Sequence, residues 1–525
     1  MLKTISELNV GYSDAQNYMR RANKQMFSEV FVKNDYLDRL LYPQVYYLVG
    51  EKGTGKTAYA TYLTNTDYHN TKSILKFISN TDYEKFYELK KRKQIDISGY
   101  SDIWKTILLL LLAKCVMDDQ RVVSMSAKSN LPSLMRAIDE YYDNAFSPEI
   151  INALKIVDNS EAFAKVLCKI AEAGGNEGRT VEVNGQQLQM NLLYISKKFT
   201  DSFEKLKLSK NVTLYIDGID VRPNQIPYED YLQCIKGLAN ACWYLNTEIF
   251  ANVKDSKGQL KVVLLLRPDI FNSLNLQNAT NKLVDNAVYL DWKTTYTEYR
   301  DSYLYEMANK LLAYGQTEKV QEIWEQYFKW DIPSSNKSQR KKDTAFMEFL
   351  RISLSRPRDI QMILYLLKTI MTNRRMGNMR EFDFNTFKSD RFQNDYSEYF
   401  LGALKDQLSF YYSDEDFKHF KKFFDLFKEP QFTFEQYQNA YEKYENYILD
   451  NASDVPKFVE NSKTFLQLLY DCNVVTAIED DGKYFHFSYR EKSPSNIAPE
   501  VLFGKDIQYR FHFGMYKKAN MGRYE

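Results

Sequence analysis

Residues 50–57 constrain the fold of this chain more than any other feature of the sequence. They read GEKGTGKT and fit the pattern G-x-x-x-x-G-K-[ST], although glycine is scarce, with 19 in 525 residues. A β-rich apolar run over residues 44–50 leads into the pattern, and helical spacing begins at Lys56. Glycines at such a strand-to-helix turn let successive backbone N–H groups converge on phosphate oxygens. The stretch therefore predicts a nucleotide-binding loop rather than a flexible connection between two core elements.

The residues expected to bind the nucleotide are those of this pattern and the residue after it. They are Gly50, Glu51, Lys52, Gly53, Thr54, Gly55, Lys56, Thr57 and Ala58. In this pattern the lysine reaches the β- and γ-phosphates and the hydroxyl binds the magnesium ion. We therefore expect Lys56 to act on the phosphates and Thr57 to be a ligand of Mg²⁺.

A second apolar run, NVTLYIDGIDV at residues 211–221, predicts a buried parallel strand that ends in an acid. We expect Asp217 to be the carboxylate on the magnesium side of the site. Asp220 lies three residues further on and is the better candidate to orient or deprotonate the attacking water, because the metal occupies the first acid. The alternative for both acids is an ordinary strand end.

Three more strands are expected, in the segments 72–80, 261–271 and 286–292; the second strand is expected to end in Arg267, and a helix is expected between the Asp220 loop and this strand. About five parallel strands with crossover helices make a doubly wound α/β domain, whose ligand lies at the carboxyl ends of the strands. Arg267 is expected at that edge, where a cation can sense the γ-phosphate.

Composition limits the partners and the setting. Lys and Arg number 70 and Asp and Glu 69, so net charge alone cannot hold a nucleic acid and any such contact needs a local patch. Five scattered cysteines without a C-x-x-C pair argue against a disulfide framework and favour a cytoplasmic setting. The start of the chain lacks a signal-peptide core, and the apolar run at 107–113 is too short to span a bilayer. That run predicts a buried helix, and no membrane partner is expected.

The motifs also carry a family resemblance. The segment IDGID, followed by a strand ending in LLLRPD, resembles the additional-strand branch of P-loop ATPases, which includes AAA+ proteins of the origin-recognition type and the STAND ATPases. GEKGTGKTA with LLLRPDIF and LDW is similar, over most of the chain, to bacterial ATPases called FunZ-like. This resemblance implies an α/β P-loop NTPase with Walker A and Walker B motifs, a helical lid and ATP rather than GTP.

We expect three domains: an ATPase core at 1–292 with a mostly helical insertion at about 122–210, a lid at 293–395 and a winged-helix-like domain at 396–525. Alternation in TVEV, residues 180–183, suggests a hairpin within the insertion. In the lid, LSRPRDI is similar to the sensor 2 region of AAA+ proteins, so Arg356 or Arg358 is expected to reach the γ-phosphate; solvent-exposed arginines at a helix start are the alternative. From residue 396, three short helices and a hairpin around residues 480–482 predict a winged helix.

The function expected is that of a Mg-dependent ATPase whose turnover drives a conformational change or the assembly of a homo-oligomer. Because no second catalytic constellation is visible, its output is expected to pass through a partner protein. A role in bacterial antiviral defence rests on the family resemblance alone. Two alternatives stay open: a DNA-binding, remodelling or loader ATPase, and a nucleotide-gated scaffold that does not hydrolyse ATP.

Overall fold

The computed structural model describes residues 2–78, 83–84, 87, 97–144, 185–316, 322–332, 343–452 and 454–519. The chain forms two compact units. The first contains Met1–Asn34, Gly50–Gly55 and Leu290–Glu525, and the second contains Asp35–Val49 and Lys56–Tyr289. The stretch Gly50–Gly55 is thus grouped with residues more than 230 positions away rather than with the strand that precedes it.

The second unit is built on a five-stranded sheet in which every pair of neighbours is parallel. Its strands are β1 (Tyr47–Val49), β2 (Thr71–Phe77), β3 (Asn211–Asp217), β4 (Leu260–Leu266) and β5 (Ala287–Tyr289). Their order is β2-β3-β4-β1-β5. Strands β1, β4 and β5 are buried along their whole length, as their continuous apolar runs predict for a sheet covered on both faces. The predicted α/β fold with about five parallel strands is therefore confirmed.

Strand β3 ends at the predicted acid, Asp217, and β4 ends one residue before the predicted Arg267. Strands β2 and β5 end earlier than predicted, at Phe77 and Tyr289. Strand β3 stops at Asp217 because Gly218 takes a φ of +87°, and a Cβ at that position would lie 2.3 Å from the carbonyl oxygen of Ile78. Strand β4 stops at Leu266 because Pro268 occupies the first turn of helix α11, where proline's fixed φ suits a helix start.

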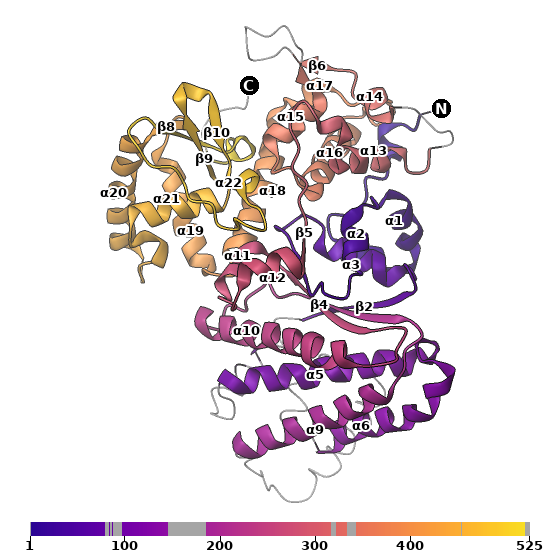
Figure 1. Ribbon diagram of the computed structural model, residues 1–525. Coiled ribbons are helices and arrows are strands. Elements are labelled where there is room, and N and C mark those ends of the chain that lie inside the picture. Colours follow the sequence, from indigo (N-terminus) through magenta and orange to yellow (C-terminus); the bar gives the residue numbers. More distant parts are fainter. Residues whose placement is uncertain are drawn as a thin grey trace, which may run out of the picture. The chain divides into compact units, whose positions relative to one another are not determined.

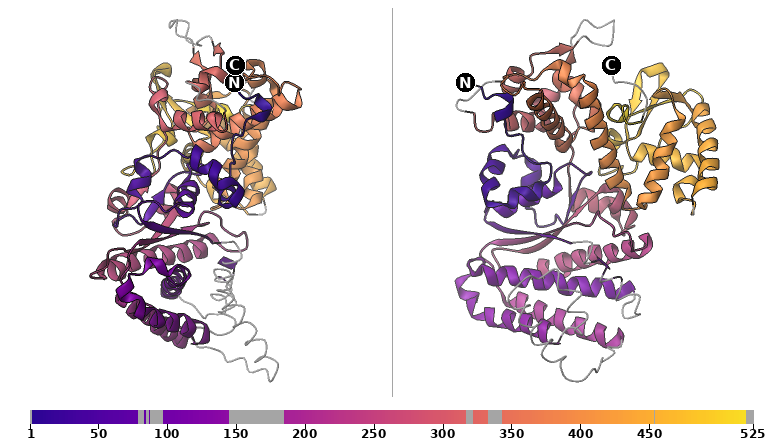
Figure 2. Two further views of the ribbon diagram at one scale, coloured as in Figure 1. Left: turned by 90° about the vertical axis from the view of Figure 1, so that its right-hand side faces the viewer. Right: turned by 180° about the vertical axis from the view of Figure 1, so that it is seen from behind.

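Helices cover both faces of this sheet, with α3 on one side and α5 and α10 on the other (Figure 1). The helices of the unit are α2 (Asp35–Arg39), α3 (Lys56–Asn65), α5 (Ile97–Asp118), α6 (Leu131–Asn144), α9 (Gly185–Lys205), α10 (Tyr228–Tyr244), α11 (Pro268–Ser273) and α12 (Ala279–Asp285). The purple and magenta helices α5, α6 and α9 lie together in the views of Figure 2. The apolar run at 107–113 lies inside α5 and is buried, as predicted. The hairpin expected at 180–183 lies outside the described residues.

In the first unit, the described residues between 303 and 408 are mostly helical, apart from the short antiparallel pair β6 (Asp331–Ile332) and β7 (Asp343–Thr344). The helices are α13 (Tyr303–Ala313), α14 (Ile323–Tyr327), α15 (Ala345–Ile352), α16 (Pro357–Asn373), α17 (Phe384–Phe387) and α18 (Asp390–Leu408). The helical conformation is interrupted between α15 and α16, where Ser355 has a φ of +51° and Pro357 starts the next helix. The N-terminal segment joins these helices through α1 (Lys24–Val30) and a backbone hydrogen bond from Ile5 to Met379, a packing that the sequence did not predict.

The C-terminal part of the first unit contains the three helices and the hairpin that the sequence predicts. These are α19 (Asp414–Lys422), α20 (Phe434–Asn451), α21 (Ser462–Asp471) and the antiparallel pair β9 (Val475–Glu479) and β10 (Tyr484–His486). Two short strands that were not predicted, β8 (Gln431–Thr433) and β11 (Gln508–Phe511), extend the hairpin into a four-stranded antiparallel sheet. The second predicted strand of the hairpin is shorter than expected, because residues Ser488–Glu491 form helix α22. Buried aromatic side chains, among them Phe420, Phe423 and Phe465, fill the core.

Candidate functional site

Two predicted ligands of the magnesium ion meet in the second unit. Thr57 stands in the first turn of α3, and Asp217 is the last residue of β3. The hydroxyl of Thr57 donates a hydrogen bond of 2.6 Å to Oδ2 of Asp217, and the backbone N–H of Gly218 donates one of 2.8 Å to Oδ1. The contact between Thr57 and Asp217 follows from the parallel sheet, whose strand ends and following helix starts share one edge. The fold therefore brings together two oxygen-bearing side chains that are 160 positions apart in the sequence.

The Asp217 carboxyl is an unusual acid because it is only 8% exposed. Burial raises its pKa above the ordinary value, and the negative charge of Asp220 raises it further. The hydrogen bonds from Thr57 and Gly218 and the charge of Lys56 act in the opposite direction but do not cancel the effect of burial. A carboxylate in this position gains from a nearby cation, which would offset the cost of burying its charge.

We expect Asp217→Asn to stabilise the protein in a buffer that contains a chelator. A raised pKa means that the folded state binds the proton more tightly than the unfolded chain, so the ionised carboxylate destabilises the fold increasingly as the pH rises above about 4. Asparagine carries no charge and can still accept from Gly218 and donate to Thr57. The unfolding free energy should therefore rise at pH 7.5, and the rise should shrink as the pH falls to about 4, where the carboxyl is largely protonated in the folded state.

Chemical denaturation of both proteins at the two pH values measures this gain, with the exposed Asp285→Asn as the matched control. A loss of stability at pH 7.5, or a gain that does not shrink near pH 4, would contradict the electrostatic origin assigned to it.

Asp220 and Arg267 differ sharply in their surroundings. Asp220 is partly exposed in the turn after β3, close enough for its charge to act on the pKa of Asp217. Arg267 follows β4 and has no exposed surface; its Nε and Nη2 donate to the two carboxylate oxygens of Asp269 at 3.0 and 2.6 Å. The predicted γ-phosphate sensor is thus bound to a carboxylate two residues along the chain, a partner the sequence analysis did not consider.

The loop Gly50–Gly55, described within the first unit, forms a tight turn. Thr54 donates from both its backbone N–H and its hydroxyl to the carbonyl oxygen of Glu51, at 3.2 and 2.8 Å. Gly53 and Gly55 have φ values of +92° and +94°, a region that side chains other than glycine's rarely enter. Among the described residues, no group accepts a hydrogen bond from the backbone N–H of Gly53 or Gly55. The turn therefore presents N–H donors that an anion can bind.

Three consecutive carbonyl oxygens of this loop are bound by donors from later segments, an arrangement that we call the carbonyl clamp. The three bonds join Arg356 Nη1 to Lys52 O (2.8 Å), the backbone N–H of Arg358 to Gly53 O (3.3 Å) and Trp292 Nε1 to Thr54 O (2.8 Å). The sequence predicted a role for the two arginines but gave no partner for them, and it treated Trp292 only as the end of a strand.

The two predicted sensor arginines differ in burial and in hydrogen bonding. Arg356 is 8% exposed and forms a bidentate pair with Asp359, through Nε and Nη2, at 3.0 Å for each bond. Arg358 is half-buried, and among the described residues its guanidinium has no hydrogen-bond or ion-pair partner. The spacing of Asp359, three residues after Arg356 and in the first helical turn, is the sequence signal that could have revealed this pair.

Side chains of the loop also contact the C-terminal part of the first unit. The buried Lys492 forms an ion pair of 2.8 Å with Glu51, and Lys52 forms one of 2.9 Å with Asp406. Lys293 donates to the carbonyl oxygen of Lys492 at 2.7 Å, which fixes this segment further. Lys492 is 441 positions from Glu51 in the sequence, so no local pattern predicts this contact.

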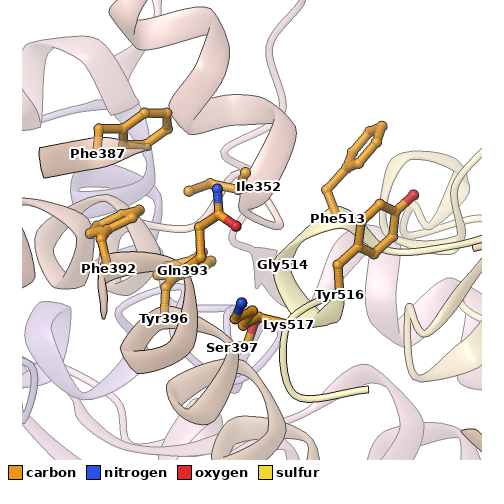
Figure 3. Close-up of a pocket in the computed structure, with 10 residues that line it drawn as sticks. All are labelled: Ile352, Phe387, Phe392, Gln393, Tyr396, Ser397, Phe513, Gly514, Tyr516 and Lys517. Carbon is orange, nitrogen blue, oxygen red and sulfur yellow. The ribbon is translucent and has the colours of Figure 1, made fainter. Parts of the chain in front are cut away.

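A cavity elsewhere in the first unit is too small for a nucleotide. It lies among α15, α17, α18 and the turn around Gly514, and its side chains are drawn in Figure 3. Its volume of about 20 Å³ holds roughly one water molecule. Within the second unit, the candidate site is defined by the start of α3 and the end of β3.

Within the described part of the chain, no group of three or more His, Cys, Asp or Glu side chains could hold a metal ion. The residues that are present suit Mg²⁺ bound jointly with phosphates, since this ion commonly takes one or two protein oxygens and completes its shell with substrate and water.

No helix of the described residues is both long and apolar enough to cross a membrane. Comparisons with protein-family models, with curated proteins and with solved structures found no match.

Proposed function

We propose that this protein binds MgATP at residues 50–57 and hydrolyses it to ADP and phosphate. The observation that carries the proposal is the hydrogen bond of 2.6 Å between Thr57 and Asp217. A phosphate-loop pattern alone occurs by chance, and so does an acid at the end of an apolar strand. Their contact in the fold places a hydroxyl and a carboxylate together directly after the loop, as a shared magnesium site requires.

Each residue has a distinct role in this proposal. The N–H groups of the loop and of the first turn of α3 bind phosphate oxygens, and Lys56 adds a positive charge beside the β- and γ-phosphates. Thr57 and Asp217 hold the magnesium ion, which when bound supplies positive charge that stabilises the phosphates. Asp220 orients the attacking water, since it is close to Asp217 but more exposed. The strand order, with β4 between β1 and β3, is compatible with the additional-strand architecture that the sequence resembles.

The output of turnover is a change in conformation or assembly. Support comes from the ion pairs that join Glu51 and Lys52 to Lys492 and Asp406, because they link the loop directly to the C-terminal part of the chain. We assign this part, with its three helices and hairpin, to a winged-helix class, and the helices over residues 303–373 to a lid. Delivery of the signal to an effector protein, and a role in bacterial defence, rest on the family resemblance.

Equilibrium binding tests the proposal at its first step. Purified protein should bind a fluorescent ATP analogue more tightly with Mg²⁺ than with EDTA, and Asp217→Asn should lose that difference while it keeps the metal-independent affinity. The same protein should release phosphate from ATP at a rate of about 1 s⁻¹ if it is an enzyme at the low end of ordinary turnover. Affinity that does not depend on the metal in the wild-type protein would contradict the assigned roles of Thr57 and Asp217.

A further inference from the structure

The carbonyl clamp fixes which way the peptide groups of the phosphate loop face. In a trans peptide the C=O of one residue and the N–H of the next point in opposite directions. Because Arg356 binds the carbonyl of Lys52, the N–H of Gly53 is directed away from Arg356. The bond from Trp292 to the carbonyl of Thr54 directs the N–H of Gly55 away from Trp292 in the same manner. These are the two N–H groups for which the described residues offer no acceptor.

Arg356 is itself held rigidly. Its Nε and Nη2 bind Asp359 and its Nη1 binds the loop, so all three nitrogens are engaged. Asp359 is 1% exposed and also accepts hydrogen bonds from the Leu354 backbone at 2.9 Å and from the hydroxyl of Tyr399 at 2.7 Å. Burial opposes the charge of Arg356, yet Asp359 raises its pKa, so the pair stays ionised. A guanidinium bound in this way cannot turn toward a phosphate without leaving the buried Asp359 unpaired.

We propose that Arg356 is a positioning residue of the phosphate loop and not a group that contacts the γ-phosphate. Together with Trp292, it holds the loop in the conformation that an anion binds, before any nucleotide arrives. The inference rests on the proposed function and deepens it, because it separates the two arginines that the sequence could not distinguish. A pre-organised loop should increase the affinity for every ligand that carries the α- and β-phosphates. The affinities for ADP and for ATP should therefore increase by the same factor.

The affinities of two variants for ADP and for ATP test this inference. Arg356→Ala removes the donor to Lys52. Trp292→Phe removes the five-membered ring of the indole with the N–H that binds Thr54, while it keeps a six-membered aromatic ring. Each variant should weaken the binding of ADP and the binding of ATP by the same factor, about tenfold, as expected for a lost hydrogen bond to a buried carbonyl. Isothermal titration calorimetry in Mg²⁺ buffer measures both constants, and circular dichroism verifies the fold. If Arg356→Ala does not fold, Trp292→Phe carries the test alone.

Arg358→Ala is the matched control, because it removes a neighbouring guanidinium but keeps the backbone N–H that binds Gly53. It should leave the affinity for ADP within about twofold. A loss of ATP affinity with unchanged ADP affinity in Arg356→Ala would overturn the inference and make Arg356 a γ-phosphate contact. Unchanged affinities in Trp292→Phe would also overturn it. Wild-type protein that binds neither nucleotide would overturn the proposed function, and the inference with it, whereas the other outcomes leave the proposed function intact.

Discussion

Asp220→Asn is expected to lower the rate of ATP hydrolysis by about 10²- to 10⁴-fold, the usual contribution of a positioned general base. Asparagine has the same shape as aspartate but cannot accept a proton from the attacking water. The affinity for MgATP should change little, because Thr57 and Asp217 remain in place to hold the metal ion. The variant should therefore bind ATP and retain it. Phosphate release under single-turnover conditions measures the rate, and nucleotide titration measures the affinity.

The control for this prediction is Asp285→Asn, which removes an exposed carboxylate at the end of α12 in the same unit. It should keep the wild-type rate. Equal loss of affinity and rate in Asp220→Asn would show that this residue binds the nucleotide complex rather than the water. If the wild-type protein binds ATP tightly but never releases phosphate, and Asp220→Asn changes nothing, the non-hydrolysing scaffold is the correct alternative.

The sheet was predictable because each of its strands forms a recognisable apolar run in the sequence. A strand buried on both faces must be apolar throughout, and such runs stand out between helical patterns. Once the sheet is parallel, its carboxyl ends share one edge, so the meeting of Thr57 with Asp217 could be predicted although 160 positions separate them. The strands predicted too long were β2 and β5, which end at Phe77 and Tyr289.

The partners of the arginines could not be predicted in the same way. A charged side chain near a helix start can face solvent, a ligand or a carboxylate, and the sequence pattern is the same in all three cases. Arg267 and Arg356 both bind an acid two or three residues along the chain, and these short-range pairs could have been considered. The bond from Trp292 to Thr54 spans 238 positions and involves a backbone carbonyl, so no residue pattern encodes it.

Small strands and the N-terminal segment were missed for a different reason. Strands β8 and β11 have three and four residues, too few for an alternating pattern to be distinguished from chance. They form because each pairs with a neighbour in an antiparallel sheet, which is a tertiary effect. The segment before residue 35 contains short helical turns that depend on helices far along the chain, such as α13 and α16. Sequence patterns describe local preference, and these elements are set by distant contacts.

Lys56→Ala is expected to weaken MgATP binding by about 100-fold, because it removes a charge-assisted contact to the phosphates. This change also decides whether nucleotide drives assembly. The Asp220→Asn protein should retain ATP. Its particle mass is expected to increase to a defined multiple of the 62.0 kDa chain mass when MgATP is added. The double variant with Lys56→Ala should stay at its starting mass at the same ATP concentration. Light scattering coupled to gel filtration measures both.

The control for the double variant is Lys197→Ala in the Asp220→Asn background, since Lys197 is an exposed lysine on α9. It should assemble as Asp220→Asn does. A mass that stays constant in Asp220→Asn with saturating MgATP would contradict nucleotide-driven assembly, and the coupling would then lie within a fixed oligomer. In that case DNA should be added to the hydrolysis assay. Stimulation that falls steeply with salt would favour the loader alternative, because contacts to DNA phosphates release counterions.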